Sequence, residues 1–324
     1  MDQHFDMNIL IRFPARFFAV SLTLLATVWA LPSDAATKRL RVAGGPEGSP
    51  EMAAATGLCN FMNQELDLSG YACETVAAPG PEDGLRALRA GAVDLAFVDS
   101  NLVDNATDRL NLRTVLTMFP KLLTVATSKR SAIRIEDLHR SKVAVGPTGS
   151  QSARLFDIMQ ENRLFRSRFE LERVTLSSQQ ARIEALCSGS VDAAAFVVSH
   201  PSVRIDDLAD SCEVEIISVC CDRKQDEFLK AGPAYLKGTI TGGFYPGSRQ
   251  SAQSIGVRSL LISAKELPNS AARLVVDVVA DGFDRFRMLD RPLFNTTPEI
   301  MATSESPLIR HPGAVKAFST KALN

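Results

Sequence analysis

The sequence has 324 residues, of which 45% are hydrophobic and 23% are charged, and its formal net charge is −1. This length exceeds the usual size of one domain and is sufficient for two hydrophobic cores. The balanced charge argues against a nucleic-acid-binding surface, because such surfaces carry a clear excess of basic residues.

The N-terminal segment, residues 1–35, has the organisation of a secretory signal peptide. Two arginines precede an apolar run at residues 17–30, and small residues follow it. This order is typical of a cleaved leader, so we expect the mature chain in the periplasm. Met1 and Met7 are alternative starts. An uncleaved anchor is the other interpretation, although the run is shorter than the ~20 residues of a membrane span.

After residue 36, predicted strands and helices alternate. Short apolar runs predict the strands, and apolar residues at helical spacing predict the helices. The predicted strands are residues 40–43, 71–77, 93–98, 112–119, 122–128, 142–145, 170–174, 191–198, 214–219 and 254–263; the predicted helices follow Ser49 and Ser150 or span 85–90, 179–187, 226–229 and 268–286. This order indicates an α/β fold, with mostly parallel sheets flanked by helices.

One motif occurs twice, at residues 88–101 and 186–201. Both copies read Leu-x-x-Gly-x-Val-Asp followed by a strand and a polar loop. The repeat predicts two similar lobes with a cleft between them. We expect the first lobe at residues 36–127 and 247–324 and the second at 128–246. Crossings of the chain near 124–129 and 247–255 would then form a two-strand hinge.

Polar loops follow the predicted strands at the edge of a parallel sheet where ligands bind. They lie at residues 44–49, 79–83, 99–101, 146–151 and 199–200. The candidate ligand contacts in these loops are Gly45, Ser49, Asp83, Asp99, Ser100, Thr148, Gly149, Ser150, Gln151, Ser199 and His200. The sequence therefore predicts one ligand site at the interface of the lobes.

The loop at residues 146–151 joins a strand to a helix through a Gly-rich turn. Free backbone N–H groups and the positive end of the helix dipole would meet there, which suits a carboxylate or phosphate. The alternative is that Ser150 only caps the helix. The similar turn at 44–49 in the other lobe favours a ligand site.

Two strand ends allow more than one role. His200 could donate a hydrogen bond to a ligand carboxylate, or it could cap the next helix or face solvent. Asp99, Ser100 and Asn101 hold the matching position in the first lobe, where helix capping is the alternative. A ligand amino group would suit an acidic Asp99.

Six cysteines in an exported chain suggest disulfides. Cys59 and Cys73 flank a helix–strand connection, and Cys187 and Cys212 flank a strand–helix unit. Local pairing would give each lobe one disulfide and leave the adjacent cysteines 220 and 221. Other connectivities and free thiols remain open.

Motifs for metal binding and nucleophilic catalysis are missing from the sequence. There is no histidine pair at ligand spacing, no Cys-x-x-Cys and no Gly-x-Ser-x-Gly. We therefore predict no metal site, no cofactor and no enzymatic activity. An enzyme on the same scaffold is the least favoured alternative.

Several segments together resemble the TAXI-type solute-binding proteins of TRAP transporters, over about residues 40–318. They are 56–59 with Cys73, 88–98, 143–150, 199–201, 245–247 with 255–257, and 310–314. The resemblance implies a two-lobed type II periplasmic-binding-protein fold. It also implies capture of a small organic anion, such as a dicarboxylate, 2-oxo acid or acidic amino acid, and its delivery to an ion-driven membrane permease.

The chain departs from that family in its loops. Asp99, Ser100 and Asn101 stand where the family has Gln-Ser-Asp, and Gln151 replaces a glycine. Glu47, Glu82 and Asp99 make the loops acidic for an anion site. A zwitterionic or cationic ligand is therefore an alternative, and a periplasmic sensor that signals through a membrane protein is the alternative function.

Overall fold

The computed structural model describes residues 37–64, 69–104, 106–128, 132–161, 170–220, 233–303 and 305–321. The predicted signal peptide, the predicted helix at 226–229 and Cys221 lie outside these residues.

The described elements alternate between strands and helices. The strands are β1 Lys38–Ala43, β2 Tyr71–Val76, β3 Leu95–Asp99, β4 Leu112–Thr127, β5 Lys142–Val145, β6 Glu172–Thr175, β7 Ala193–Val198, β8 Glu215–Ile217, β9 Leu236–Ile240 and β10 Ala252–Ala264. The α-helices are α1 Pro50–Gln64, α3 Pro81–Arg89, α4 Ser100–Asp104, α5 Gln151–Glu161, α6 Gln179–Cys187, α7 Val203–Ser211, α9 Asn269–Asp281, α10 Phe283–Arg287, α11 Pro298–Ala302 and α12 Pro312–Thr320. Short 3₁₀ turns are η1 Arg109–Asn111, η2 Ile135–Leu138 and η3 Arg291–Asn295.

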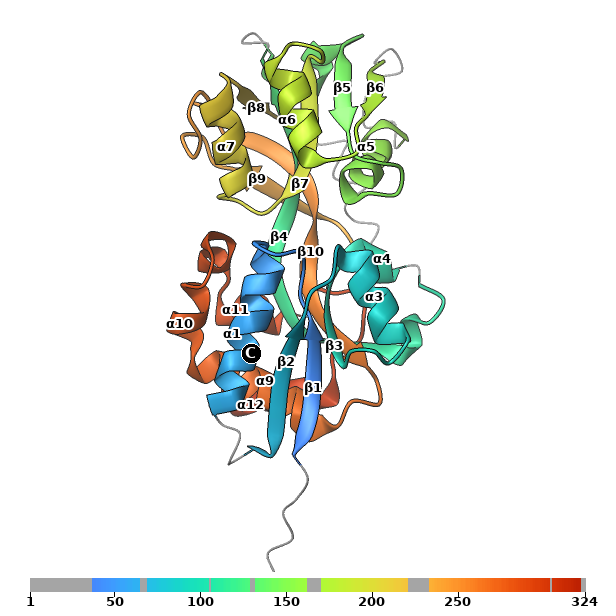
Figure 1. Cartoon of the computed structure of the whole chain (residues 1–324), viewed down its shortest axis with the longest axis vertical. Helices are drawn as coiled ribbons and strands as arrows, with labels where there is room; N and C mark the ends of the chain where they lie inside the picture. Colours follow the sequence, from blue (N-terminus) through green and yellow to red (C-terminus); the bar gives the residue numbers. More distant parts are fainter. Residues whose placement is uncertain are drawn as a thin grey trace, which may run out of the picture. The chain divides into compact units, whose positions relative to one another are not determined.

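One sheet runs through the described part of the chain, in the order β2-β1-β3-β10-β4-β7-β5-β6, with β8 paired to β4 and β9 to β10. In the first lobe β1 pairs in parallel with β2 and β3, and in the second β5 pairs in parallel with β6 and β7. The long strands β4 and β10 are antiparallel to each other and pass from one lobe into the other (Figure 1). The predicted two-lobed α/β architecture with two connecting strands is therefore confirmed.

Each lobe has its own hydrophobic cores. On β4, residues up to Phe119 pack with the first-lobe clusters, whereas residues from Leu122 onward pack with the second-lobe clusters. On β10 the same change falls between Val257 and Leu260. The change of core thus lies inside both long strands. The lobe boundaries at 127/128 and 246/247 stay a prediction.

Local sequence explains why these elements form. β3 reads LAFVD and is buried at every position, because helices cover both faces of the sheet. The predicted cap of α1 is confirmed: the backbone N–H of Met52 donates to Ser49 Oγ over 3.2 Å, and Pro50 occupies the first helical position. These features direct the N-terminus of α1 to the carboxyl edge of the sheet.

The repeated motif plays the same structural part in both lobes. Gly91 and Gly189 end their helices with left-handed φ angles of 66° and 73°, which glycine adopts without steric cost. Asp94 Oδ2 accepts a hydrogen bond from a backbone N–H of β1 over 2.7 Å, and Asp192 Oδ2 accepts one from β5 over 2.8 Å. The aspartates therefore fix neighbouring strands and lie away from the carboxyl edge.

β4 continues through Pro120, so the predicted break between two strands is wrong. Pro120 pairs with Arg258 of β10, and β7 pairs with β4 only from Leu122 onward. The other edge of β4 has no described strand beside Pro120, so a residue without an N–H fits there.

The single helix predicted at 268–286 is instead two helices, α9 and α10, with Gly282 between them. A Cβ at Gly282 would lie 2.9 Å from Cε2 of Phe61. The glycine therefore permits α1 to pack closely where the helix ends. The polar segment after β3 also differs from expectation, because α4 begins directly at Ser100.

Both predicted local disulfides are present. Cys59 bonds to Cys73 between α1 and β2, and Cys187 bonds to Cys212 between α6 and the end of α7. Cys220 is disulfide-bonded as well. Free thiols, the alternative considered from the sequence, are therefore excluded for these five cysteines.

Candidate functional site

A cavity of about 360 Å³ lies between the two lobes, at the carboxyl ends of the parallel strands. In such sheets this edge is where ligands bind. The polar groups of its first-lobe wall belong mainly to Ser49, Glu51, Glu82, Asp99, Lys121, Asp290 and Arg291, and those of the second to Ser150, Gln151, Gln179, Ser199, Ser202 and Arg204. Valines and prolines complete the lining.

A buried ion cluster forms the floor of the first-lobe wall. Lys121 Nζ lies 2.9 and 3.2 Å from the two carboxylate oxygens of Asp99, and 3.2 Å from Glu51 Oε1. The Asp99 side chain is 1% exposed and that of Lys121 is 15% exposed. Asp99 is at the last position of β3 and Lys121 is in mid-β4, so the sheet itself brings them together.

The cluster carries more negative than positive charge. Burial raises the pKa of Asp99, and the nearby Lys121 ammonium opposes this rise. Burial disfavours the charged form of Lys121, but Asp99 and Glu51 outweigh it and raise the Lys121 pKa above its ordinary value. One ammonium is therefore shared between two carboxylates.

Asp290 adds a further carboxyl group to the same wall. Burial raises its pKa, the negative charge of Glu51 raises it further, and the adjacent Arg291 lowers it. Arg291 is itself engaged by Asp206 of α7 at 2.6 Å. Both cations described in the first-lobe wall, Lys121 and Arg291, are therefore already paired with carboxylates.

The second-lobe wall is built on the N-terminus of α5. The backbone N–H of Ala153 donates to Ser150 Oγ over 3.3 Å, so Ser150 caps this helix, as one of the two sequence interpretations has it. Ser150 and Gln151 also line the cavity. The positive end of the helix dipole consequently faces the cavity.

Gln151 connects the two walls. Its Nε2 donates to Asp99 Oδ2 and to Asn101 Oδ1, both over 2.8 Å, and its Oε1 accepts from Asn101 Nδ2 over 3.1 Å. Arg154 and Glu82 form a second link between the lobes at 3.4 Å. The lobes therefore meet through polar side chains at the cavity.

The cavity brings together five of the predicted ligand contacts, namely Ser49, Asp99, Ser150, Gln151 and Ser199. Gly45 lines a smaller recess of about 40 Å³ beside Asp99 and Lys121. Five other predicted contacts are outside the cavity lining: Asp83, Ser100, Thr148, Gly149 and His200. Of these, Asp83 pairs with Arg86 on the surface of α3.

Ser100 is fully buried and has a structural role. Its hydroxyl donates to the carbonyl of Ala234 over 2.6 Å and accepts from the backbone N–H of Arg258 over 3.0 Å. It therefore ties α4 to β10 and to the segment before β9.

His200 lies behind the second-lobe wall. Its Nε2 is 2.8 Å from Thr124 Oγ1, and its Nδ1 is 2.6 Å from the Tyr245 hydroxyl. Burial lowers the pKa of His200 to about 4, so the imidazole is neutral at physiological pH. Both ring nitrogens are engaged within the protein, which leaves neither for the carboxylate contact considered from the sequence.

Sequence reasoning missed Glu51, Lys121, Asp290 and Gln179 as cavity residues. Lys121 carried a usable signal, because it is the one charged residue in the run 114–127 and a charge in a buried strand requires a partner. Asp290 follows a surface helix and had no comparable signal.

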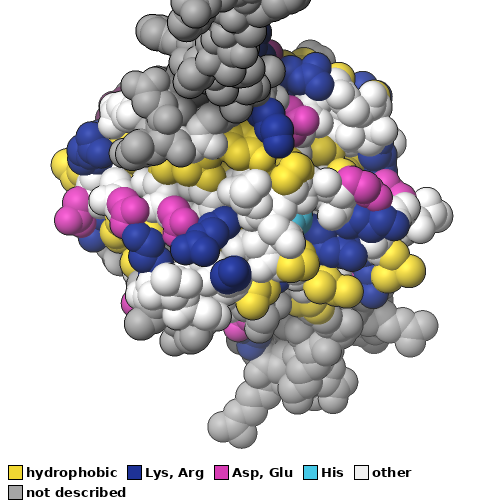
Figure 2. Space-filling model, turned by 90° about the horizontal axis from the view of Figure 1, so that it is seen from below, with side chains coloured by type: hydrophobic (Ala, Val, Ile, Leu, Met, Phe, Trp, Pro, Cys, Tyr) yellow, Lys and Arg dark blue, Asp and Glu magenta, His cyan; other side chains and the backbone are white. Residues whose placement is uncertain are grey.

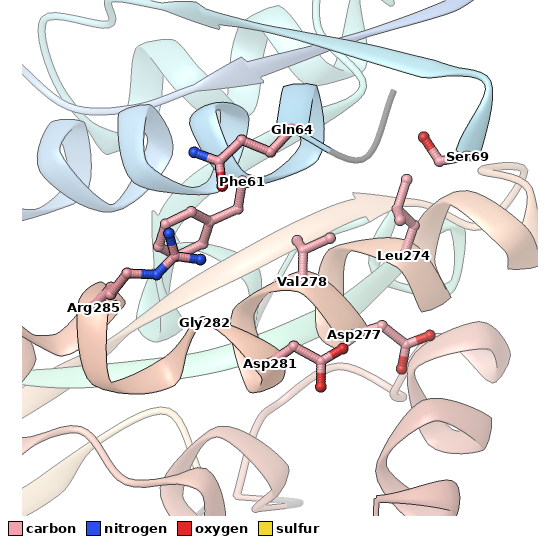
Figure 3. Close-up of a pocket in the computed structure, with 9 residues that line it drawn as sticks. All are labelled: Phe61, Gln64, Ser69, Leu274, Asp277, Val278, Asp281, Gly282 and Arg285. Atoms are coloured by element: carbon pink, nitrogen blue, oxygen red, sulfur yellow. The ribbon is translucent and has the colours of Figure 1, made fainter. Parts of the chain in front are cut away.

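A second cavity, of about 320 Å³, lies within the first lobe between α1 and the helices α9 and α10 (Figure 3). The guanidinium of Arg285 lies over the ring of Phe61, 4.8 Å from its centroid. Asp277 and Asp281 also line this cavity, from α9. None of the predicted ligand contacts lines it.

On the face shown in Figure 2, basic, acidic and apolar side chains are interspersed. Among the described residues, no group of three or more His, Cys, Asp or Glu side chains is arranged to hold a metal ion. The helices described also include none that is long and apolar enough to cross a membrane.

Two α/β lobes joined by two strands, with a polar cavity between them, correspond to the two-lobed periplasmic-binding-protein fold. The chain belongs to the NMT1-like family, whose family model matches residues 42–321. No curated protein matches it significantly.

Solved structures with a similar fold have low sequence identity. XAC2383 from Xanthomonas citri, solved with chloride ion and with ATP, is 11% identical, with a TM-score of 0.51 over 87% of this chain and 95% of that one. Substrate binding domain 2 of GlnP from Lactococcus lactis is 11% identical, with a TM-score of 0.48 over 82% and 97%. A putative L-cystine ABC transporter from Listeria monocytogenes is 12% identical, with a TM-score of 0.47 over 78% and 94%. At these identities the similarity concerns the fold alone.

Proposed function

We propose that the chain is an extracytoplasmic solute-binding protein that captures a small organic acid or amino acid between its lobes and delivers it to a membrane transporter. The cavity between the lobes carries this proposal, because both lobes line it and charged groups are concentrated in its walls. Its volume is at the lower end of the ~300–1,000 Å³ of small-molecule sites.

We propose a TRAP-type permease as the membrane partner, on the motifs that resemble TAXI proteins. The signal-peptide-like N-terminus favours a periplasmic location. The proposed protein binds and releases its solute without chemical change.

Binding can be tested by calorimetry and thermal unfolding with a panel of small acids and amino acids. A bound solute at 100 times its Kd should stabilise the folded protein by about 2.7 kcal/mol. Bound solute should be recovered unchanged, whereas a converted product would indicate an enzyme. If nothing in a broad panel binds, solute capture is refuted.

Two matched variants that each remove a helix-capping hydroxyl test whether the solute binds in the cavity. Ser150→Ala and Thr297→Ala each remove a hydroxyl that caps a helix over 3.3 Å, but only Ser150 lines the cavity. Affinity should fall in the first variant alone. Transport in vesicles containing either a TRAP-type or an ABC-type permease then identifies the partner.

A further inference from the structure

Arg182 of α6 is a buried cation without an anionic partner. It is 4% exposed, and its guanidinium makes no hydrogen bond or ion pair with any residue that the structure describes. Its guanidinium carbon lies 5.3 Å from the centroid of the Phe196 ring. Burial lowers the pKa of Arg182 to about 10, so it stays protonated at neutral pH. An unpaired buried charge is costly, and a bound anion would offset that cost.

The guanidinium points to the start of α5. A Cβ built on Gly146 would lie 3.1 Å from Arg182 Nη1, 2.7 Å from Ser152 Oγ, and closest to Ser150 Oγ. A side chain at residue 146 would collide with the two hydroxyls, so glycine there lets the guanidinium, the hydroxyls and the helix N-terminus come close together. This combination suits a carboxylate.

This cluster borders the cavity between the lobes. Ser150 belongs to the lining, and so does Gln179, which lies one turn before Arg182 on α6. Residues three apart on a helix share a face, so Arg182 is on the same side of α6 as Gln179 and lies directly behind the cavity lining, which does not include it.

The opposite wall has the reverse charge. Glu51 and Asp99 share one ammonium, that of Lys121, and the cation near Asp290 is Arg291, which is also paired with Asp206. A ligand ammonium group would supply the missing positive charge at this wall.

We infer that the solute carries both charges. Its carboxylate binds at Ser150 and the N-terminus of α5, where the guanidinium of Arg182 behind the lining supplies the positive charge, and its ammonium group binds near Glu51 and Asp290 on the first lobe. The inference rests on the proposed function and narrows it to α-amino acids and similar zwitterions. It excludes the dicarboxylates and 2-oxo acids that the family resemblance implies.

Matched ligands test the two charges separately by calorimetry. One set is leucine, 3-methylbutylamine and 4-methyl-2-oxopentanoate; the other is phenylalanine, 2-phenylethylamine and phenylpyruvate. In at least one set, the amino acid should bind at least ten times more tightly than the compounds lacking one charged group. An oxo acid that binds as tightly as its amino acid overturns the ammonium assignment, and an amine that does so overturns the carboxylate assignment.

The same panel separates this inference from the proposed function. Binding of only oxo acids, dicarboxylates or uncharged solutes overturns the inference and leaves solute capture intact. If no solute of any class binds, both fail.

Two arginine variants test the carboxylate site. Arg182→Met should lower amino-acid affinity at least 100-fold without lowering the melting temperature of the ligand-free protein. Arg310→Met is the control, because Arg310 is a half-buried arginine that also lies over a phenylalanine ring, yet it donates to the carbonyls of Val115, Met301 and Thr303. That variant should lose stability and keep its affinity for solute. Unchanged affinity in Arg182→Met overturns the inference.

More conservative variants test the same site with a lower risk of misfolding. Arg182→Lys keeps the charge without the planar fork and should weaken binding about tenfold. Asp290→Asn should also weaken it at least tenfold, whereas Asp284→Asn, on the exposed surface of α10, should not. Equal affinities in the two aspartate variants contradict the ammonium site.

Discussion

Replacement of Lys121 by methionine tests the buried ion cluster of the first lobe. The substitution keeps an unbranched side chain, one atom shorter, but removes the ammonium from Asp99, which is 1% exposed, and from Glu51. Removal of one partner of a buried ion pair costs about 3–5 kcal/mol, because it leaves a charge without compensation. Gln151 still donates to Asp99, so we expect a loss near the lower limit, about 3 kcal/mol at pH 7.

The loss should depend on pH in a defined direction. Burial raises the pKa of Asp99 in the folded state, and the absence of Lys121 raises it further. A folded-state pKa above the unfolded one means that destabilisation grows as pH rises from the unfolded pKa to the folded pKa. The difference between Lys121→Met and the wild type should therefore be smaller at pH 4.5 than at pH 7.

Equilibrium denaturation in urea measures these differences. The double variant Asp99→Asn with Lys121→Met should recover most of the loss, because no buried charge remains at residue 99. Lys265→Met is the control, since its ion pair with Glu266 is exposed and should contribute less than about 1 kcal/mol. A loss below about 1 kcal/mol in Lys121→Met, or no recovery in the double variant, would refute the reasoning.

Three further changes test other parts of the molecule. Gln151→Ala removes the hydrogen bonds to Asp99 and Asn101 between the lobes. Solute affinity should fall about tenfold (about 1.4 kcal/mol), while the free energy of unfolding changes little. Unaltered affinity would show that these bonds do not support closure of the lobes. Replacement of Cys187 and Cys212 by serine removes a disulfide with a sequence separation of 25, and it should lower the free energy of unfolding in urea by about 3.5 kcal/mol. The same change at Cys59 and Cys73, whose separation is 14, should cost slightly less, and the reverse order would contradict the loop-closure argument. Burial lowers the His200 pKa to about 4, below the unfolded value near 6.5, so the free energy of unfolding should decline by up to about 3 kcal/mol as pH falls from 6.5 to 4. The decline should be shallower in His200→Gln, and parallel curves for the two proteins would refute the lowered His200 pKa.

The fold could be predicted because its signals are local. Gly91 and Gly189 end helices at matching places, apolar runs mark the strands, and the spacing of the cysteines suggested both disulfides. The predicted strand break at Pro120 was wrong because the effect of a proline depends on whether a neighbouring strand needs its N–H. Only the sheet order shows that no described strand does. The end of α9 at Gly282 was missed because the packing partner of this glycine, Phe61, is far away in the sequence.

The site could be predicted only in part, because strand ends predict where side chains gather but not how they pair. Ser49 and Ser150 follow from helix capping, and both line the cavity. The engagement of His200 by Thr124 and Tyr245 depends on contacts between distant segments. The same applies to the buried Arg182, which looks in the sequence like an ordinary polar residue of a helix.

The pairing of Pro120 with Arg258 has a mechanical consequence. Beside Pro120 the other edge of β4 has no described strand, and at Arg258 the outer edge of β10 donates to the Ser100 hydroxyl instead of to a strand. The described sheet therefore narrows to β4 and β10 next to the register shift of β10. We expect the two strands to bend there, because a two-stranded ribbon twists more readily than a wide sheet. The opening angle would then be governed by side-chain contacts at the cavity, and a solute with only a modest preference for the closed state could shift the population.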